Sequence, residues 1–355
     1  MNLKEFFTPQ AVAANWAAVN AQAAPYLGAG LFPARKKAGL DLTWLKGAKG
    51  LPVSLMPAAF DAKAPLRDRI GCDKLEAEMP FFREGFKLKE RDRQELLRSV
   101  DASDPYALAM MERLFEDTCE LIEAANVVPE RMICQLLFPE NGNMMISIRA
   151  NGVDYSYNYD EDGSWKKNHF VQLSGSDCWS NANSADPFRD FKNARDLVRQ
   201  ASGVELTTAI MSTNTFELLA ASDAVKDRFL SAFSIPRGFL FEEDVKTVIK
   251  GAAKMQIALY DRMYRDENHT AHPFVPDGYV CLVPDGTLGA TWYGTTPEEA
   301  DLSAAQNADV AIVNTGVAVS RIVGEHPVNL NTFVSEIVLP SFERMDEVVV
   351  LKVSA

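Results

Sequence analysis

The sequence predicts a mixed α+β chain of 355 residues whose N-terminal part has little core of its own. Three observations predict this class. Glycine and proline recur at short intervals from Pro25 to Gly71, so no helix of ordinary length fits there. A long amphipathic pattern then predicts a helix from about Asp104 to Asn126. From about Asp186, helical and short strand-like patterns mix, and a hydrophobic fraction of 47% supplies a sizeable core.

The first 100 residues predict extended pieces rather than a compact domain. Thr8 and Pro9 are typical of a helix start, and they predict a short alanine-rich helix that ends near Gln22. Strands are expected at 40–45 and 51–56, as parts of a long two-stranded excursion. Because an isolated hairpin is marginally stable in water, the excursion must lie on another surface, and a neighbouring copy of the chain is a candidate.

The middle of the chain predicts a long helix followed by a β-hairpin. In the helix, apolar residues recur at spacings of three and four from Leu108 to Ile122, and Pro129 is expected to close it. Asn151-Gly152 is a two-residue turn signal for the hairpin. Apolar and aromatic residues alternate on both sides of that turn, at Met144, Ile146, Ile148, Val153, Tyr155, Tyr157 and Tyr159. A tyrosine stripe is typical of a packed sheet face, and stacking on sugars or bases is the alternative.

Helices and strands mix in the last 170 residues. Asp186 and Gly203 are expected to cap the two ends of a helix, and a second helix is expected near 242–252. Strands are expected at 206–211, 255–260, 279–283 and 310–313. The final strand, 348–353, is so apolar that we expect it inside a sheet.

Charge is distributed unevenly along the chain. The formal net charge is −13, which disfavours a sequence-reading nucleic-acid binder because phosphate binding needs clustered positive charge. The residues up to Arg98 include 16 basic and 11 acidic side chains, a net of +5. The rest includes 20 basic and 38 acidic side chains, a net of −18. This split indicates two surfaces of opposite sign.

A basic cluster lies in the core-poor region, at Arg35, Lys36, Lys37, Lys46 and Lys49. Contact with nucleic acid and a solvated loop are two interpretations. The favoured one is docking in trans onto an acidic region of an identical subunit, because it explains both the charge split and the missing local core. Complementary potentials of this kind fix register and orientation more than affinity.

Motifs for catalysis are absent from the sequence: it contains no P-loop, no GxGxxG, no GxSxG and no HExxH. The best metal-like cluster is a run of acids and histidines at Asp261, Asp266, Glu267, His269 and His272. A polar loop between two strands is the favoured reading of this run. The alternative is a cytosolic α/β metal-dependent enzyme that uses Asp261, His269 and His272. The acidic residues from Asp160 to Asp162 are interpreted as a solvated turn rather than a cation site.

The spacing of the five cysteines and the absence of a long apolar run indicate the cellular compartment in which the protein folds. The cysteines form no CxxC pair, which is typical of buried thiols in a reducing compartment. Residues 6–34 are uncharged, but Asn15, Asn20 and Pro25 interrupt them, so a membrane span is not expected. We therefore expect a soluble cytosolic product.

A set of short motifs in the C-terminal half carries a family resemblance. Three of them lie close together: PFVPDG at 273–278, VCLVP at 280–284 and LGATWYGTTPEE at 288–299. The chain ends with NTFV at 331–334, VLPSFE at 338–343 and VVVLKV at 348–353. Further matches are AIMS at 209–212, Phe216, Val225-Lys226 and EEDV at 242–245. As a set, these motifs resemble the lambda-type major capsid protein E family of tailed bacteriophages.

The resemblance implies the Hong Kong 97-type capsid fold, an α+β architecture with five parts. These are an N-terminal arm at 1–34, an extended loop (E-loop) at 35–82, a peripheral domain with a long spine helix and β-hairpin at 83–185, an axial domain at 186–331, and a return to the peripheral domain at 332–355.

The implied function is that of a major capsid protein, which self-assembles into the icosahedral head shell around phage double-stranded DNA. No catalytic residue, cofactor or metal is expected. The expected inter-subunit contacts join the basic cluster and Trp44 of the E-loop to an acidic face of the spine helix at Glu116, Glu120 and Glu123. The implied partners are further copies in hexamers and pentamers, portal, scaffolding and decoration proteins, and non-specifically contacted DNA, but no membrane. The implied location is the virion, after assembly in the host cytoplasm. An encapsulin-like shell around protein cargo is a further alternative.

Overall fold

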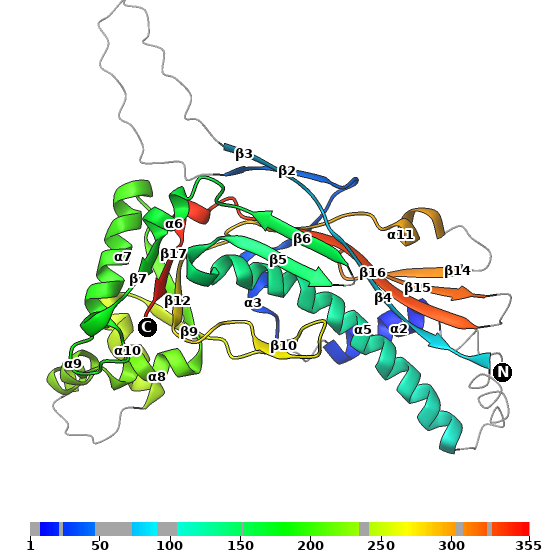
Figure 1. The fold of residues 1–355 in the computed structure, drawn as a ribbon. Helices are drawn as coiled ribbons and strands as arrows, with labels where there is room; N and C mark the ends of the chain where they lie inside the picture. The colour runs from blue at the N-terminus through cyan, green and yellow to red at the C-terminus, as the bar shows by residue number, and fades with distance from the viewer. Residues whose placement is uncertain are drawn as a thin grey trace, which may run out of the picture. The chain divides into compact units, whose positions relative to one another are not determined.

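The computed structural model describes residues 8–20, 24–46, 73–90, 105–150, 152–233, 241–302, 308–324 and 329–354. Its contacts divide the chain into two compact units, each built from three separate segments. Unit 1 comprises Met1–Leu42, Glu76–Met132 and Ala290–Ser341, and unit 2 comprises Thr43–Leu75, Ile133–Gly289 and Phe342–Ala355. The chain therefore passes between the units several times. Figure 1 colours its course from blue at the N-terminus to red at the C-terminus.

Unit 1 contains a six-stranded sheet organised around one long strand, β16 (Leu330–Ser341). The other strands are β1 (Ala34–Lys36), β4 (Phe81–Leu88), β13 (Ala290–Tyr293), β14 (Ala308–Val313) and β15 (Val317–Val323). Residues 330–335 of β16 pair with β15, and residues 338–341 pair with β13. On its other edge, residues 330–337 pair with β4. One strand thus joins two groups of neighbours.

Helices cover the sheet of unit 1. They are α2 (Pro9–Asn20), α3 (Leu27–Leu31), α11 (Pro297–Asp301) and most of α5 (Pro105–Leu137). Val12 and Trp16 of α2 are buried with Leu121 and Ile122 of α5 against apolar side chains of β14, β15 and β16. The predicted N-terminal helix is therefore confirmed, and its apolar residues belong to a core of the same chain.

Unit 2 contains a five-stranded sheet in the order β7-β17-β12-β8-β9. Its strands are β7 (Phe170–Gln172), β8 (Leu206–Met211), β9 (Gln256–Leu259), β12 (Tyr279–Pro284) and β17 (Val349–Lys352). Beside it lie α7 (Pro187–Ser202), α8 (Thr213–Ala221), α9 (Asp223–Phe233) and α10 (Glu242–Ala253), which Figure 1 shows gathered next to these strands. Asp186 caps α7 by accepting a hydrogen bond from the Arg189 amide, and Gly203 ends it at a φ of 75°. The apolar strand β17 lies inside this sheet, as the sequence predicts.

Smaller elements complete the fold. The predicted tyrosine hairpin is formed by β5 (Met145–Ala150) and β6 (Val153–Asn158). The two-stranded excursion begins as a ribbon of β2 (Asp41–Lys46) and β3 (Asp73–Glu78), while the strand expected at 51–56 and the loop residue Lys49 lie outside the described residues. A second small hairpin joins β10 (Met263–Arg265) to β11 (Ala271–Pro273). The remaining short pieces are α6 (Ser164–His169), η1 (Glu140–Gly142), η2 (Gly175–Asp177) and η4 (Met345–Glu347).

The long helix α5 differs from its prediction. It spans 33 residues and continues through Pro129 to Leu137, so the predicted end near Asn126 is wrong. Proline inside a helix costs about 3 kcal/mol because it removes a hydrogen bond and crowds the carbonyl four residues earlier. Here the last two turns bury Met132, Leu136 and Leu137 almost completely, and this burial offsets the local cost.

The five segments predicted from the sequence are continuous ranges of residues, whereas each of the two units combines three separate segments of the chain. Strand β16 runs without a break across the predicted boundary between 331 and 332. Strand β17, assigned to the peripheral return, pairs with β12 of the predicted axial segment and with β7 of the predicted peripheral segment. The five boundaries stay a prediction.

Two sequence features concern compartment. Within the described ranges, no helix is both long and apolar enough to cross a membrane. Cys119, Cys134, Cys178 and Cys281 are free thiols. Burial raises the pKa of the Cys281 thiol, which is typical of a packing role.

Candidate functional site

The basic residues of strand β1 have partners within their own unit. The Lys36 ammonium lies 2.5 Å from a carboxylate oxygen of Glu299 in α11. The Arg35 guanidinium lies 5.6 Å from the ring centre of Trp292, and the Lys37 ammonium donates to the Asp41 carbonyl. Because Arg35 and Lys36 of β1 are also exposed, the strand combines contacts within the chain with an accessible basic surface, whereas Lys37 follows the strand and is half-buried.

Helix α11 is the acidic partner of this basic strand. Glu298, which is only 4% exposed, forms an ion pair with Arg83 of β4 and accepts a hydrogen bond of 2.9 Å from the Ser335 hydroxyl of β16. Together with the pair of Lys36 and Glu299, these contacts tie β1, β4 and β16 to one short helix. Sequence reasoning missed this cluster, because only the fold brings these distant segments together.

The residues at the base of the predicted E-loop have a different set of contacts, in unit 2. Trp44 is 7% exposed and packs against the Tyr159 ring, with 5.3 Å between the ring centres. The Lys46 ammonium lies 3.8 Å from an Asp160 oxygen and 3.9 Å from an Asp162 oxygen. Two residues expected in inter-subunit contacts thus have partners in their own chain.

The acidic face expected on the spine helix is present on α5. Glu116, Glu120 and Glu123 are all exposed. The Glu123 carboxylate accepts a hydrogen bond of 2.5 Å from the Tyr26 hydroxyl. Two turns further, buried Glu130 accepts a hydrogen bond of 2.8 Å from the Gly28 amide at the start of α3. Part of this face therefore holds the N-terminal segment of the same chain.

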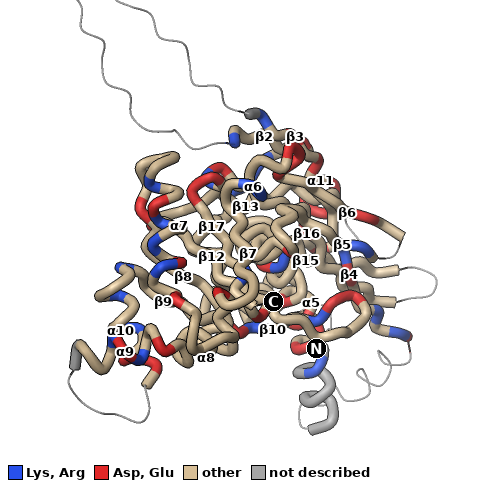
Figure 2. The backbone as a smooth tube through the Cα atoms, turned by 60° about the vertical axis from the view of Figure 1, so that its left-hand side comes forward, with Lys and Arg blue, Asp and Glu red and all other residues tan. Residues whose placement is uncertain are grey.

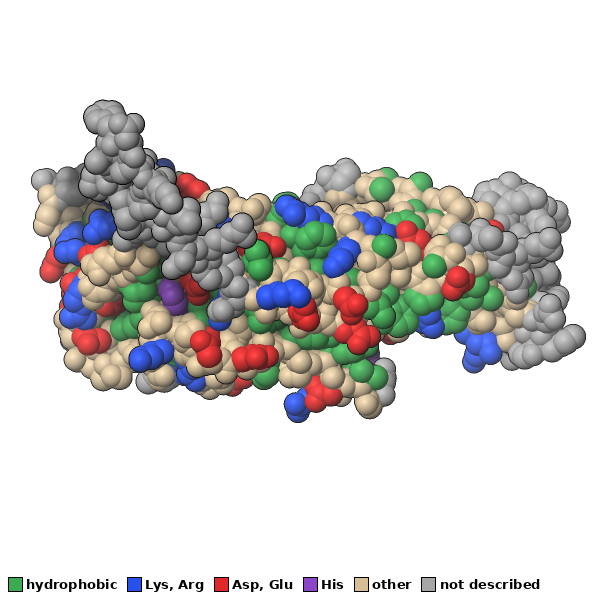
Figure 3. Space-filling view, turned by 90° about the horizontal axis from the view of Figure 1, so that it is seen from above, with side chains coloured by type: hydrophobic (Ala, Val, Ile, Leu, Met, Phe, Trp, Pro, Cys, Tyr) green, Lys and Arg blue, Asp and Glu red, His purple; other side chains and the backbone are tan. Residues whose placement is uncertain are grey.

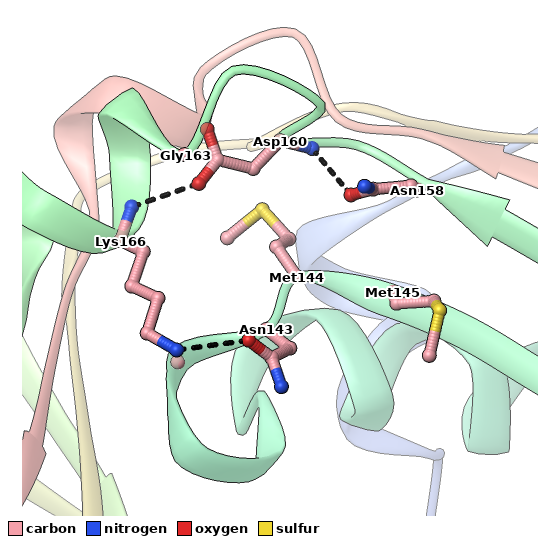
Figure 4. Close-up of a pocket in the computed structure, with 8 residues that line it drawn as sticks. Asn143, Met144, Met145, Asn158, Asp160, Gly163 and Lys166 are labelled. Atoms are coloured by element: carbon pink, nitrogen blue, oxygen red, sulfur yellow. Dashed lines mark hydrogen bonds between the residues drawn. The ribbon is translucent and has the colours of Figure 1, made fainter.

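A pocket of about 300 Å³ lies in unit 2 beside the β5–β6 hairpin (Figure 4). Met144 and Met145 line it together with Asn143, Asp160 and Lys166. The Lys166 ammonium donates to the Asn143 side chain at 2.9 Å. Both Asp160 oxygens accept backbone N–H groups of the first turn of α6, each at 2.9 Å. These polar groups serve local structure, so the pocket offers no constellation of nucleophile and base.

The acid and histidine run at Asp261–His272 forms a hairpin turn. One Asp266 carboxylate oxygen accepts the amides of Asn268 and Thr270, and the other lies 3.1 Å from a ring nitrogen of His272. The hydrogen bond from the Thr270 amide is the main cause that lowers the pKa of Asp266. Asp261 instead caps α8 through the amide and hydroxyl of Thr213. No group of acids, histidines and cysteines with metal-binding geometry exists among the residues that the structure describes.

Charged side chains are interspersed over the surface. Figure 2 shows basic and acidic residues interspersed along the described backbone. On the face seen in Figure 3, basic and acidic side chains lie next to one another, with hydrophobic side chains reaching the surface between them. Exposed apolar side chains include Leu45, Phe86, Val153 and Phe241. A mixed, partly apolar surface is suited to many contacts with other proteins.

The described residues form an α+β fold whose surface mixes charged and apolar side chains. Comparison with known proteins identifies the class. The family model for phage major capsid protein E matches residues 9–353. The chain therefore belongs to the phage major capsid protein E family.

Solved structures support the same fold. A phage-related protein from Bordetella bronchiseptica RB50 has a TM-score of 0.56 and 13% identity, and the match covers 97% of each chain. A prophage protein of E. coli CFT073, described as a capsid protein, has a TM-score of 0.59 and 12% identity, with 98% of this chain and 99% of that chain covered. No curated protein sequence matches the chain.

These findings confirm the Hong Kong 97-type capsid fold and the function as a phage major capsid protein. The family implies a structural role and a place in the virion. Neither the metal-dependent enzyme nor the encapsulin-like shell is favoured by the family match.

Proposed function

We propose that many copies of this chain, arranged as hexamers and pentamers, close into an icosahedral head around double-stranded phage DNA. The observation that carries this proposal is the family match, which extends over nearly the whole chain. Portal, scaffolding and decoration proteins are the proposed partners, and the host cytoplasm is the proposed place of assembly. Copurification of nuclease-resistant double-stranded DNA with particles made during phage production tests the enclosure of DNA.

The net charge bears on how such a shell contacts its DNA. At −13 per chain, the subunit repels phosphate overall. Along the described backbone, lysine and arginine positions are interspersed with acidic positions (Figure 2). Contacts with packaged DNA are therefore non-specific and weak in this proposal, with counterions offsetting the repulsion.

The proposed docking surface between subunits includes β1 and the base of the E-loop. The exposure of β1 and the opposite charges of the two parts of the sequence support contact with acidic surface on a neighbouring copy, such as Glu116 and Glu120. Lys36 and Lys46 also form ion pairs within the chain, with Glu299 and Asp160, so they have a second role in stabilising the subunit itself. A useful experiment must separate these two roles.

A charge swap at Lys36 and Glu299 separates them. Lys36→Glu alone breaks the pair within the chain and reverses the charge shown to neighbours, so we expect it to reduce assembly. Lys36→Glu combined with Glu299→Lys restores an ion pair within the chain while keeping the reversed charge on β1. If β1 docks on an acidic neighbour, the double variant stays folded by circular dichroism but still assembles poorly in light scattering. Full recovery of assembly in the double variant would show that the pair acts only within the subunit.

A further inference from the structure

Glu336 of β16 is a buried acid for which the described part of the chain supplies no hydrogen-bond partner. Its side chain is 1% exposed, and neither carboxyl oxygen has a hydrogen-bond partner in the structure. Burying an ionised carboxylate in this way costs far more free energy than burying the neutral acid. Unpartnered buried polar groups are rare in folded proteins, so this one calls for a physical explanation.

The neighbouring acid Glu298 shows how the same sheet accommodates a charge. Glu298 is buried to a similar degree, but it has the Arg83 guanidinium and the Ser335 hydroxyl as partners. Ser335 and Glu336 are consecutive on β16, so their side chains point to opposite faces of the sheet. One face therefore holds a partnered glutamate, and the other holds an unpartnered one.

Glu336 lies where β16 exchanges one neighbouring strand for another. Pairing with β15 ends at Ser335, and pairing with β13 begins at Val338. Between them, the Gly294 amide donates to the Ile337 carbonyl at 2.8 Å. A Cβ at Gly294 would lie 2.6 Å from the Ile337 side chain, so the Gly294 backbone is in close contact with that side chain. We call residues 293–294 and 335–338 the strand junction.

Among the described residues of the sheet, no basic side chain on this face forms an ion pair with Glu336. Register places Glu84 of β4 and Arg321 of β15 on this face, and Arg321 is paired with Asp309. Tyr293 is the titratable neighbour: burial and the negative charge of Glu336 both raise the pKa of its hydroxyl. Burial likewise raises the pKa of Glu336 well above its ordinary value of 4.5.

We propose that Glu336 is a proton-dependent switch of the strand junction: the closed sheet holds the neutral acid, and ionisation favours an open junction in which water reaches the carboxylate. The proposal concerns the subunit itself and does not rest on the shell that the subunit builds. It assigns a conformational role to one acid of β16.

The direction of the pH dependence follows from the proton balance. The closed junction keeps the proton to a higher pH than the open one does, so closure is most favourable at low pH and weakens as pH rises above the ordinary value of 4.5. Because one proton is released on opening, the open fraction rises about tenfold per pH unit until the raised pKa of the closed state is reached.

Hydrogen exchange of the complete chain tests the proposal. Protection factors of amides in the strand junction are measured from pH 5 to pH 8.5 and corrected for the intrinsic pH dependence of exchange. We expect wild-type protection to fall by up to about tenfold per pH unit. In Glu336→Gln it should be independent of pH and higher than wild type at pH 8. If the Glu336→Gln variant does not fold, Glu336→Met, which removes the polar group, is used in its place. Amide protection in Glu336→Met should also be independent of pH.

Two matched variants serve as controls. Glu84→Gln changes an exposed acid on the adjacent strand and should keep the wild-type slope. Glu298→Gln removes the ion pair of Glu298 with Arg83. It should lower the protection of the junction amides at every pH without changing how steeply protection falls with pH. A wild-type slope in Glu336→Gln, or pH-independent protection in the wild type, would overturn the proposal. So would lower protection at every pH in both Glu336 variants, because that result indicates an ionised, partnered carboxylate.

Discussion

The acidic side chains of α5 differ in what they contact, so single residues on one helix have different roles. Glu116 and Glu120 are exposed, whereas Glu130 is 2% exposed and binds the Gly28 amide. The sequence pattern predicted an acidic face but could not distinguish these roles. Glu130 follows Pro129, where the sequence indicates a helix end, so no local signal marks it as a buried contact for the N-terminal segment.

Replacement of Glu130 tests its role in holding the N-terminal segment. Glu130→Ala leaves the Gly28 amide without its acceptor, so we expect the free energy of unfolding to fall by about 1–3 kcal/mol. Chemical denaturation of the subunit measures this change. Glu123→Ala is the control, because it removes an exposed contact to the same segment and should cost less than about 1 kcal/mol. Equal losses in the two variants would contradict the assignment.

The sequence shows which charged residues can form contacts more readily than it shows which residues they pair with. The basic residues Lys36 and Lys46 were predicted as contact residues, and the structure shows that both make ion pairs within the chain. The partner of Lys36 lies 263 residues away in the sequence. No local pattern encodes such a pair, because the β-sheet topology alone brings the two residues together.

At the scale of elements, local patterns predicted part of the C-terminal region, including α7, α10 and β17, but they did not predict β15 or the long strand β16. The Asn151-Gly152 turn and the caps of α7 depend on neighbouring residues, so the sequence contains the whole signal. Helix α5 shows the limit of this approach. Burial of its last turns overrides the stop signal at Pro129, and burial depends on the rest of the fold.

Helix α2 gives a test at the element scale. Trp16 is 5% exposed and packs into the core shared by α2, α5 and the sheet of unit 1. We expect Trp16→Ala to cost about 3–5 kcal/mol, because it leaves a cavity in that core. Denaturation measures this loss, and limited proteolysis should show faster cleavage within α2.

The neighbouring residue Asn15 supplies the control for this test. Asn15 is exposed on the same helix, so Asn15→Ala should change neither the stability nor the cleavage rate appreciably. Unchanged cleavage of α2 in Trp16→Ala would show that the apolar contact does not hold the helix.

At the scale of the whole molecule, the order of elements along the chain is easier to predict than their grouping. Each compact unit takes segments from three regions of the chain, and β16 pairs with strands as distant in sequence as β4 and β15. Composition and periodicity contain no information on such pairings. The family resemblance supplied the capsid fold, and its expectation was confirmed by the match over residues 9–353.

The charge split acquires a more specific meaning from the structure. Basic residues of the first 98 meet acids of the remainder within one chain, as Lys36 meets Glu299 and Arg83 meets Glu298. Part of the complementarity expected between subunits thus stabilises the subunit itself. The exposed residues of β1 and the exposed acids of α5 are the part that is available to neighbouring copies.

The central claim is that this chain builds a closed shell. Electron microscopy of the purified chain, expressed alone and together with a scaffolding protein, tests it most directly, with size-exclusion chromatography on the same samples. We predict closed particles with icosahedral symmetry that elute in the megadalton range, in which each subunit has the two units described above. A folded chain that stays monomeric under both conditions, at concentrations at which related capsid proteins assemble, would contradict the account.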